Sequence, residues 1–78
     1  MIYNRISLLR AEKTMTRQEL AEKIGVNYQT IGFIERGDYS PSLELAFKIA
    51  EVFGVGVEVA FSDKEFPSLF TQENTENI

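Results

Sequence analysis

The sequence contains no cysteine and no histidine. Without cysteine, neither a disulfide nor a thiolate metal site can stabilise the fold. Without histidine, the chain also lacks a common transition-metal ligand and the most frequent general base of enzymes. We therefore expect a protein that is not an enzyme and that uses no metal and no cofactor.

Long apolar runs are also absent, and the hydrophobic stretches that do occur are too short to cross a membrane. Residues 1–10 have neither the apolar core nor the small-residue cleavage site of a secretory signal. We expect a cytoplasmic protein. Its 78 residues are near the lower limit for a self-sufficient hydrophobic core, so we expect one domain, over residues 1–70.

The net charge of −4 is distributed unevenly along the chain. Residues 1–36 carry six basic and four acidic side chains, whereas residues 37–78 carry two basic and eight acidic ones. Such asymmetry favours one half that can approach a polyanion and another that stays in solvent. Ordinary scatter of surface charge in a small chain explains it equally well.

Two short helical patterns lie within residues 16–37 with almost no connection between them. The first opens with a capping box, in which Thr16 and Glu19 satisfy each other's backbone amides. Gly25 ends it, because a left-handed backbone suits glycine, and Asn27 caps the next helix at once. The first helix places three apolar residues on one buried stripe: Leu20, Ala21 and Ile24.

The second of these helices has one face that a core needs and one that it does not. At about 100° per residue, Ile31 and Ile34 fall together on the core face. Glu35 falls at the edge of that face. The opposite side carries a mixed set of residues: Tyr28, Gln29, Gly32, Phe33 and Arg36.

An arginine is predicted on the core side of the first helix, over residues 6–13, which Asn4 would cap. An unpaired buried charge is very costly, so this arginine, Arg10, needs a counter-charge. Glu35 has the same need, and we predict that the two form an ion pair. The shared face of the first helix comprises Ile6, Leu9, Arg10 and Lys13.

Ser40 and Pro41 predict another helix start, with serine as the cap and proline at the first position. Over residues 43–53 this helix is apolar except for one strip, so we expect it to be buried as the central helix or partly in a subunit contact. The strip consists of Glu44, Lys48 and Glu51. Residues 55–61 alternate like a strand but also fit one or two helical turns, and residues 71–78 are predicted to be a disordered tail.

The chain resembles the Cro/lambda-repressor-like, or XRE, helix-turn-helix family over residues 4–61. The matching segments include QELAEKIGV (residues 18–26), IERG (34–37) and SPSLELAFKIAEVFGV (40–55). The resemblance implies a mainly all-α, compact bundle of five helices, with the helix-turn-helix at residues 16–36. It also allows a short C-terminal strand paired with residues 1–3. Thr14 departs from the family, which usually has glycine there.

In this family the second helix of the motif enters the major groove of DNA, and the start of the first rests on the phosphate backbone. Carried onto this sequence, the resemblance implies four base-reading positions, Tyr28, Gln29, Gly32 and Phe33. It implies six phosphate-contacting positions: Thr16, Arg17, Asn27, Thr30, Arg36 and Tyr39. Each residue alone has an ordinary explanation as a surface side chain, and Tyr39 is as well suited to packing in its turn.

The resemblance therefore predicts a sequence-specific regulator of transcription, of bacterial or prophage type, that binds a palindromic operator in double-stranded DNA as a homodimer. We expect a repressor, and no small-molecule ligand. The alternative is an antitoxin-like or adaptor module that uses the same fold to bind another protein, with its acidic half as the contact. The segment predicted to form the dimer is Val55–Leu69.

Overall fold

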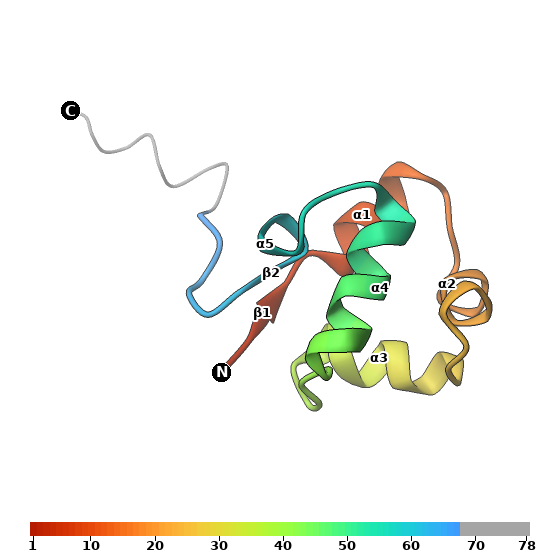
Figure 1. Cartoon of the computed structure of the whole chain (residues 1–78), viewed down its shortest axis with the longest axis horizontal. Coiled ribbons are helices and arrows are strands. Elements are labelled where there is room, and N and C mark those ends of the chain that lie inside the picture. The colour runs from red at the N-terminus through yellow and green to blue at the C-terminus, as the bar shows by residue number, and fades with distance from the viewer. Residues whose placement is uncertain (68–78) are drawn as a thin grey trace.

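The computed structural model describes residues 1–67, which form five helices and one two-stranded antiparallel sheet (Figure 1). The elements in chain order are β1 (Tyr3–Asn4), α1 (Ile6–Glu12), α2 (Arg17–Ile24), α3 (Tyr28–Arg36), α4 (Leu43–Phe53), α5 (Val57–Ala60) and β2 (Phe61–Ser62). This arrangement confirms the predicted fold class. The predicted tail, and the end of the predicted dimer segment, lie outside the described residues.

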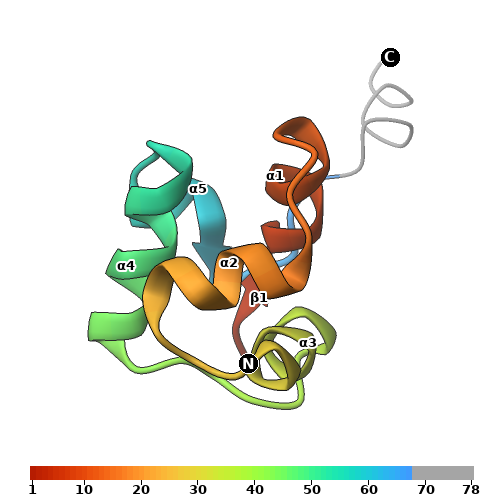
Figure 2. The same ribbon diagram turned by 90° about the vertical axis from the view of Figure 1, so that its right-hand side faces the viewer.

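The hydrophobic core lies among helices α1 to α4, and each of these helices contributes at least one fully buried side chain. Helix α2 packs against both α3 and α4, as Figure 2 shows. The fully buried side chains are Ile6, Leu20, Ile31, Ile34 and Ile49. The stripes predicted for α2 and α3 are therefore confirmed, because all of their members are buried.

The joint between α2 and α3 is as short as the sequence predicts. The Thr16 hydroxyl accepts from the Glu19 amide at 3.0 Å, and the Glu19 carboxylate accepts from the Thr16 amide at 2.9 Å. Gly25 ends α2 with φ of 77°, a left-handed conformation that costs glycine least. The side chain of Asn27 then accepts from the Gln29 amide at 2.8 Å and starts α3. Two capped helices are thus fixed at a set angle.

The uncertain segment after α4 forms both a helix and a strand. Helix α5 is one short turn, and β2 follows it and pairs antiparallel with β1, with Tyr3 opposite Ser62 and Asn4 opposite Phe61. The predicted strand pairing with the start of the chain is confirmed. Of the two structures that residues 55–61 allow, the helical turn is present at Val57–Ala60, where Ala60 is buried, and the strand is limited to Phe61–Ser62.

The predicted cap of α4 is wrong by two residues. The N-cap is Ser42, whose hydroxyl accepts from the Leu45 amide at 3.1 Å, and Pro41 precedes the helix. Proline after a serine is compatible with a cap at Ser40, but the hydroxyl that reaches an orphan amide is that of Ser42. Ser42 has the extended backbone of a cap and a hydroxyl within reach of an orphan amide.

Helix α1 is also shorter than predicted. It ends at Glu12, and Lys13 is exposed, so the prediction that Lys13 shares the inward face is wrong. The chain turns away there through Thr14, whose φ of 52° is left-handed. At the other end, the Asn4 side chain accepts from the Ile6 amide at 3.1 Å, which is the predicted capping contact, although Arg5 is the residue that directly precedes the helix.

Helix α4 is buried on one side only. Its polar strip is exposed, as predicted, but Leu43 and Phe47 also face solvent, with 71% and 54% of their surface exposed. Burial within the chain therefore does not extend to these two residues, and the predicted subunit contact at this helix stays a prediction. They lie one helical turn apart, on a side of α4 that no other described element covers. No helix within residues 1–67 has the length and apolar character of a membrane span.

Candidate nucleic-acid interface

The outer face of α3 carries large side chains that the core does not use. Tyr28 is 52% exposed and Phe33 is 47% exposed, and Gln29 between them in sequence is exposed as well. Ile31 and Ile34, on the other side of the same helix, are almost completely buried. The division of α3 into a core face and a free face therefore agrees with the angles read from the sequence.

Gly32 lies in the middle of this face but is itself buried. A Cβ atom built there would lie 3.4 Å from Nη1 of Arg17 and 3.4 Å from Nη1 of Arg36. Two guanidinium groups therefore cover the position where the helix lacks a side chain. They line a hollow of about 300 Å³ whose walls are Arg17, Tyr28, Gln29, Gly32, Phe33 and Arg36.

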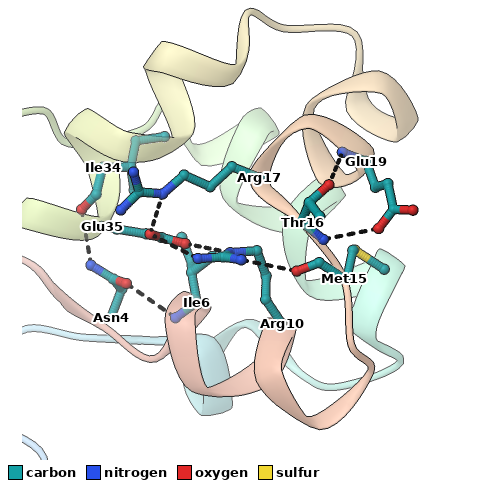
Figure 3. A network of polar contacts seen from close by, with 9 residues as sticks. All are labelled: Asn4, Ile6, Arg10, Met15, Thr16, Arg17, Glu19, Ile34 and Glu35. Atoms are coloured by element: carbon teal, nitrogen blue, oxygen red, sulfur yellow. Dashed lines mark hydrogen bonds and ion pairs between the residues drawn. The ribbon is translucent and has the colours of Figure 1, made fainter.

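Three charged residues form one network behind this hollow (Figure 3). Glu35 accepts from Nε of Arg10 at 2.7 Å and from Nε of Arg17 at 2.8 Å, and its side chain is only 5% exposed. Arg10 also donates to the Met15 carbonyl at 2.9 Å. The predicted ion pair between Arg10 and Glu35 is confirmed, and the buried carboxylate, with two guanidinium partners, is not left as an unpaired charge.

Arg36 is held by a different set of contacts. Its Nε lies 3.2 Å from the Asp38 carboxylate, and its guanidinium carbon lies 5.1 Å from the centre of the Phe33 ring. The Arg36–Asp38 pair is exposed, so it contributes little to stability. It does hold the guanidinium over the ring and beside the hollow. Sequence reasoning missed Asp38, because a pair two residues apart across a turn has no periodic signal.

Asn4 has a second role that the sequence did not predict. Besides capping α1, its side-chain amide donates to the Ile34 carbonyl at 2.9 Å (Figure 3). This bond joins β1 to the C-terminal half of α3, and the Arg10–Glu35 pair joins α1 to the same part. The outer face of α3 is therefore presented by a helix that is anchored from behind at two adjacent residues.

The remaining predicted phosphate contacts surround this face. Thr16 and Asn27 stand at the starts of α2 and α3, where both side chains are engaged in capping. Thr30 is half-buried, and Tyr39 is 49% exposed in the turn after α3. Thr30, Phe33, Asp38 and Tyr39 line a second hollow beside the first. The structure thus brings together the four predicted base-reading positions with Arg17 and Arg36 in one hollow, and Thr30 and Tyr39 in the hollow beside it, whereas Thr16 and Asn27 line neither.

Two capped helices with a tight joint, the second of them exposed along one polar and aromatic face, define a helix-turn-helix protein. A family model described as helix-turn-helix matches residues 6–59. The chain belongs to this family, the Cro/lambda-repressor-like or XRE type that its sequence resembles. Membership also confirms the prediction that the protein is not an enzyme.

Several known proteins are similar to this chain over most of its length. An uncharacterized HTH-type transcriptional regulator of Methanocaldococcus jannaschii is 52% identical over 58 residues, which are 74% of this chain and 88% of the relative. The cryptic phage CTXphi transcriptional repressor RstR of Vibrio cholerae is 37% identical over 83% of this chain and 59% of the repressor. The crystal structure of a candidate DNA-binding protein from Bacteroides fragilis is 34% identical, with a TM-score of 0.72, and covers 80% of this chain and 100% of that chain.

Proposed function

We propose that this protein is a sequence-specific regulator of transcription that binds double-stranded DNA in the cytoplasm. We further propose that it is a repressor of bacterial or prophage type and binds a palindromic operator as a homodimer, without a small-molecule ligand. The observation that carries the proposal is the outer face of α3, where an amide, two aromatic rings and the guanidinium of Arg36 lie beside the guanidinium that Arg17 extends from α2.

The amide and the two rings each match a feature of the major groove. Gln29 has the amide geometry that bonds the N6 and N7 edge of adenine with two hydrogen bonds. The exposed rings of Tyr28 and Phe33 fit the methyl group of thymine. Gly32 contributes no side chain of its own, and the guanidinium groups of Arg17 and Arg36 cover the middle of this face instead.

Phosphate contacts are proposed at the edge of this face. We retain Thr16, Asn27, Thr30, Arg36 and Tyr39 for this role, because they lie around the base-reading positions at both ends of α3 and at the start of α2. Such contacts fix the register of the protein on the duplex without reading sequence. Arg17, which the sequence also assigns to phosphate, is bound to Glu35 and has different surroundings.

Selection of bound duplexes from random DNA tests the proposal. We expect a palindrome with half-sites one helical turn apart, about 34 Å. Affinity for the selected duplex should fall steeply with salt, because neutralised phosphates release counterions. Failure to enrich any sequence, together with binding that does not depend on salt, would exclude this function.

The exposed apolar residues of α4 favour one second candidate. Leu43 and Phe47 are large, apolar and uncovered, as in a surface that binds another protein. The antitoxin-like or adaptor function would use this surface and would leave α3 free of DNA. The selection experiment separates the two candidates, because a protein-binding module enriches no DNA sequence.

A further inference from the structure

Arg17 begins α2, but its side chain lies over α3. Its Nε donates to Oε1 of Glu35 at 2.8 Å, and Figure 3 shows the side chain crossing from one helix to the other. Its carboxylate partner is almost fully buried and is held in turn by Arg10, whereas 43% of the Arg17 side chain stays exposed. The guanidinium therefore has a fixed inner edge and an accessible outer edge.

The absence of a side chain at Gly32 makes room for the Arg17 guanidinium over α3. The Nη1 and Cζ atoms of Arg17 lie 3.4 Å and 3.7 Å from the point that a Cβ atom at residue 32 would occupy. The guanidinium thus takes the place of the missing side chain in the middle of the outer face of α3. Gln29 and Phe33 line the same hollow on either side.

We propose that Arg17 is a base-reading residue directed at guanine. This inference rests on the proposed function and changes the role that the sequence assigns to Arg17. A guanidinium has only donors, so it matches a base edge that offers two adjacent acceptors. In the major groove, guanine offers O6 and N7, whereas adenine places a donor beside its single acceptor. With Nε engaged by Glu35, the two terminal nitrogens remain for these acceptors.

Position, rather than net charge, favours a base edge over a phosphate. Arg10, Arg17 and Glu35 together carry one net positive charge, which attracts a phosphate as well as the acceptors of a guanine edge. The guanidinium of Arg17, however, lies over Gly32 in the middle of the outer face, and with Nε fixed by Glu35 it loses less freedom when it binds. The buried carboxylate thus positions Arg17, and Arg17 makes the contact.

The test uses the selected operator with single-atom changes in the DNA. In one set of duplexes, each guanine is replaced in turn by 7-deazaguanine, which lacks the N7 acceptor. In a second set, each phosphate is replaced by an uncharged methylphosphonate. Binding of the full-length protein and of Arg17→Met is measured on both sets and across a salt series, with thermal unfolding as a check that the variant is folded.

We expect wild-type protein to lose about fivefold or more in affinity when one particular guanine per half-site loses N7. Arg17→Met should be insensitive to that same change and should keep the wild-type salt slope, since it loses no phosphate contact. The matched control is Arg36→Met, which removes the neighbouring guanidinium and should leave the 7-deazaguanine effect intact.

Three results would overturn the inference. If Arg17→Met is insensitive to one methylphosphonate and its salt slope falls by about 1 per half-site, Arg17 contacts phosphate. If the variant only unfolds at a lower temperature and responds to both sets like wild type, Arg17 is structural. If no 7-deazaguanine weakens wild-type binding, no guanine N7 is read. A protein that selects no operator at all fails the proposed function instead.

Discussion

Glu35 accepts a 2.7 Å hydrogen bond from Nε of Arg10, 25 residues earlier in the chain, and the two side chains are 5% and 17% exposed. This pair joins α1 to α3 behind the outer face. Removal of one member leaves a largely buried charge without its main partner. Arg10→Met and Glu35→Ala should each lower the free energy of unfolding by about 1–4 kcal/mol.

The double variant Arg10→Met/Glu35→Gln should recover part of this loss, because it removes both charges together. Chemical denaturation of the wild type, the two single variants and the double variant measures the coupling. Strict additivity would contradict a direct interaction. The appropriate control is the exposed pair, since Asp38→Ala should change stability by no more than about 0.5 kcal/mol.

Gln29→Ala should affect recognition without affecting the fold. Its side chain is exposed near the start of α3, so its loss should cost about 1–3 kcal/mol on the selected operator and relax the choice at one base pair per half-site. Binding to random DNA should hardly change, because no phosphate contact is lost. Glu51→Ala, on the exposed strip of α4, is the control. Full discrimination by Gln29→Ala would show that this glutamine reads no base.

Dimerisation is predicted through Val55–Leu69, of which the structure describes the part up to residue 67. Val59 is half-buried and is not packed against the core, whereas Val55 and Val57 are. Val59→Asp should therefore turn a dimer into a monomer in analytical ultracentrifugation while leaving the thermal midpoint of a dilute sample nearly unchanged. Phe47→Ser tests the exposed side of α4 in the same way. Loss of the dimer in that variant alone would move the interface to α4.

The corrected cap of α4 gives a matched pair of substitutions. Ser42→Ala should destabilise the protein by about 1 kcal/mol, because the Leu45 amide loses its acceptor. Ser40→Ala should lie within about 0.5 kcal/mol of wild type, since Ser40 is exposed and its hydroxyl caps no helix among residues 1–67. Thermal unfolding of both variants measures the difference. Equal effects, or a larger one at Ser40, would contradict the observed start of the helix.

Thr14 has a left-handed backbone, which costs a residue with a branched side chain about 1–2 kcal/mol. Thr14→Gly should remove this strain and raise stability by up to about 1 kcal/mol, after the greater entropy of unfolded glycine is subtracted. Thr14→Val, which keeps the branched shape, should give no gain. A thermal midpoint of Thr14→Gly at or below that of wild type would show that the turn stores no strain.

Helix ends could be predicted from the sequence wherever the nearby residues allow only one cap or one stop. The Thr16–Glu19 box, Gly25 and Asn27 each satisfy or end a helix by contacts within four residues, so their pattern determines the joint. The cap of α4 was ambiguous because serines stand on both sides of Pro41. The choice depends on which hydroxyl reaches an amide in the folded chain, and that is a property of three-dimensional structure.

In the candidate site, too, some positions could be predicted from the sequence and one could not. Helical periodicity places Tyr28, Gln29 and Phe33 on one face without any knowledge of the fold. Periodicity could not predict where the Arg17 side chain lies, because its position depends on the angle between α2 and α3 and on the space above Gly32. Periodicity within one helix contains no information about a side chain that crosses from another.

The pairing of β1 with β2 joins the two ends of the described fold. Tyr3 lies before the five helices in the chain, and its partner Ser62 lies after them. Contacts between such distant segments form late in folding, because a long loop must close first. During synthesis, α3 is therefore made before the strand that pairs with Tyr3 and Asn4. A nascent chain that stops within α5 would expose α3 without that support, and regulator activity would appear only when translation of the domain is almost complete.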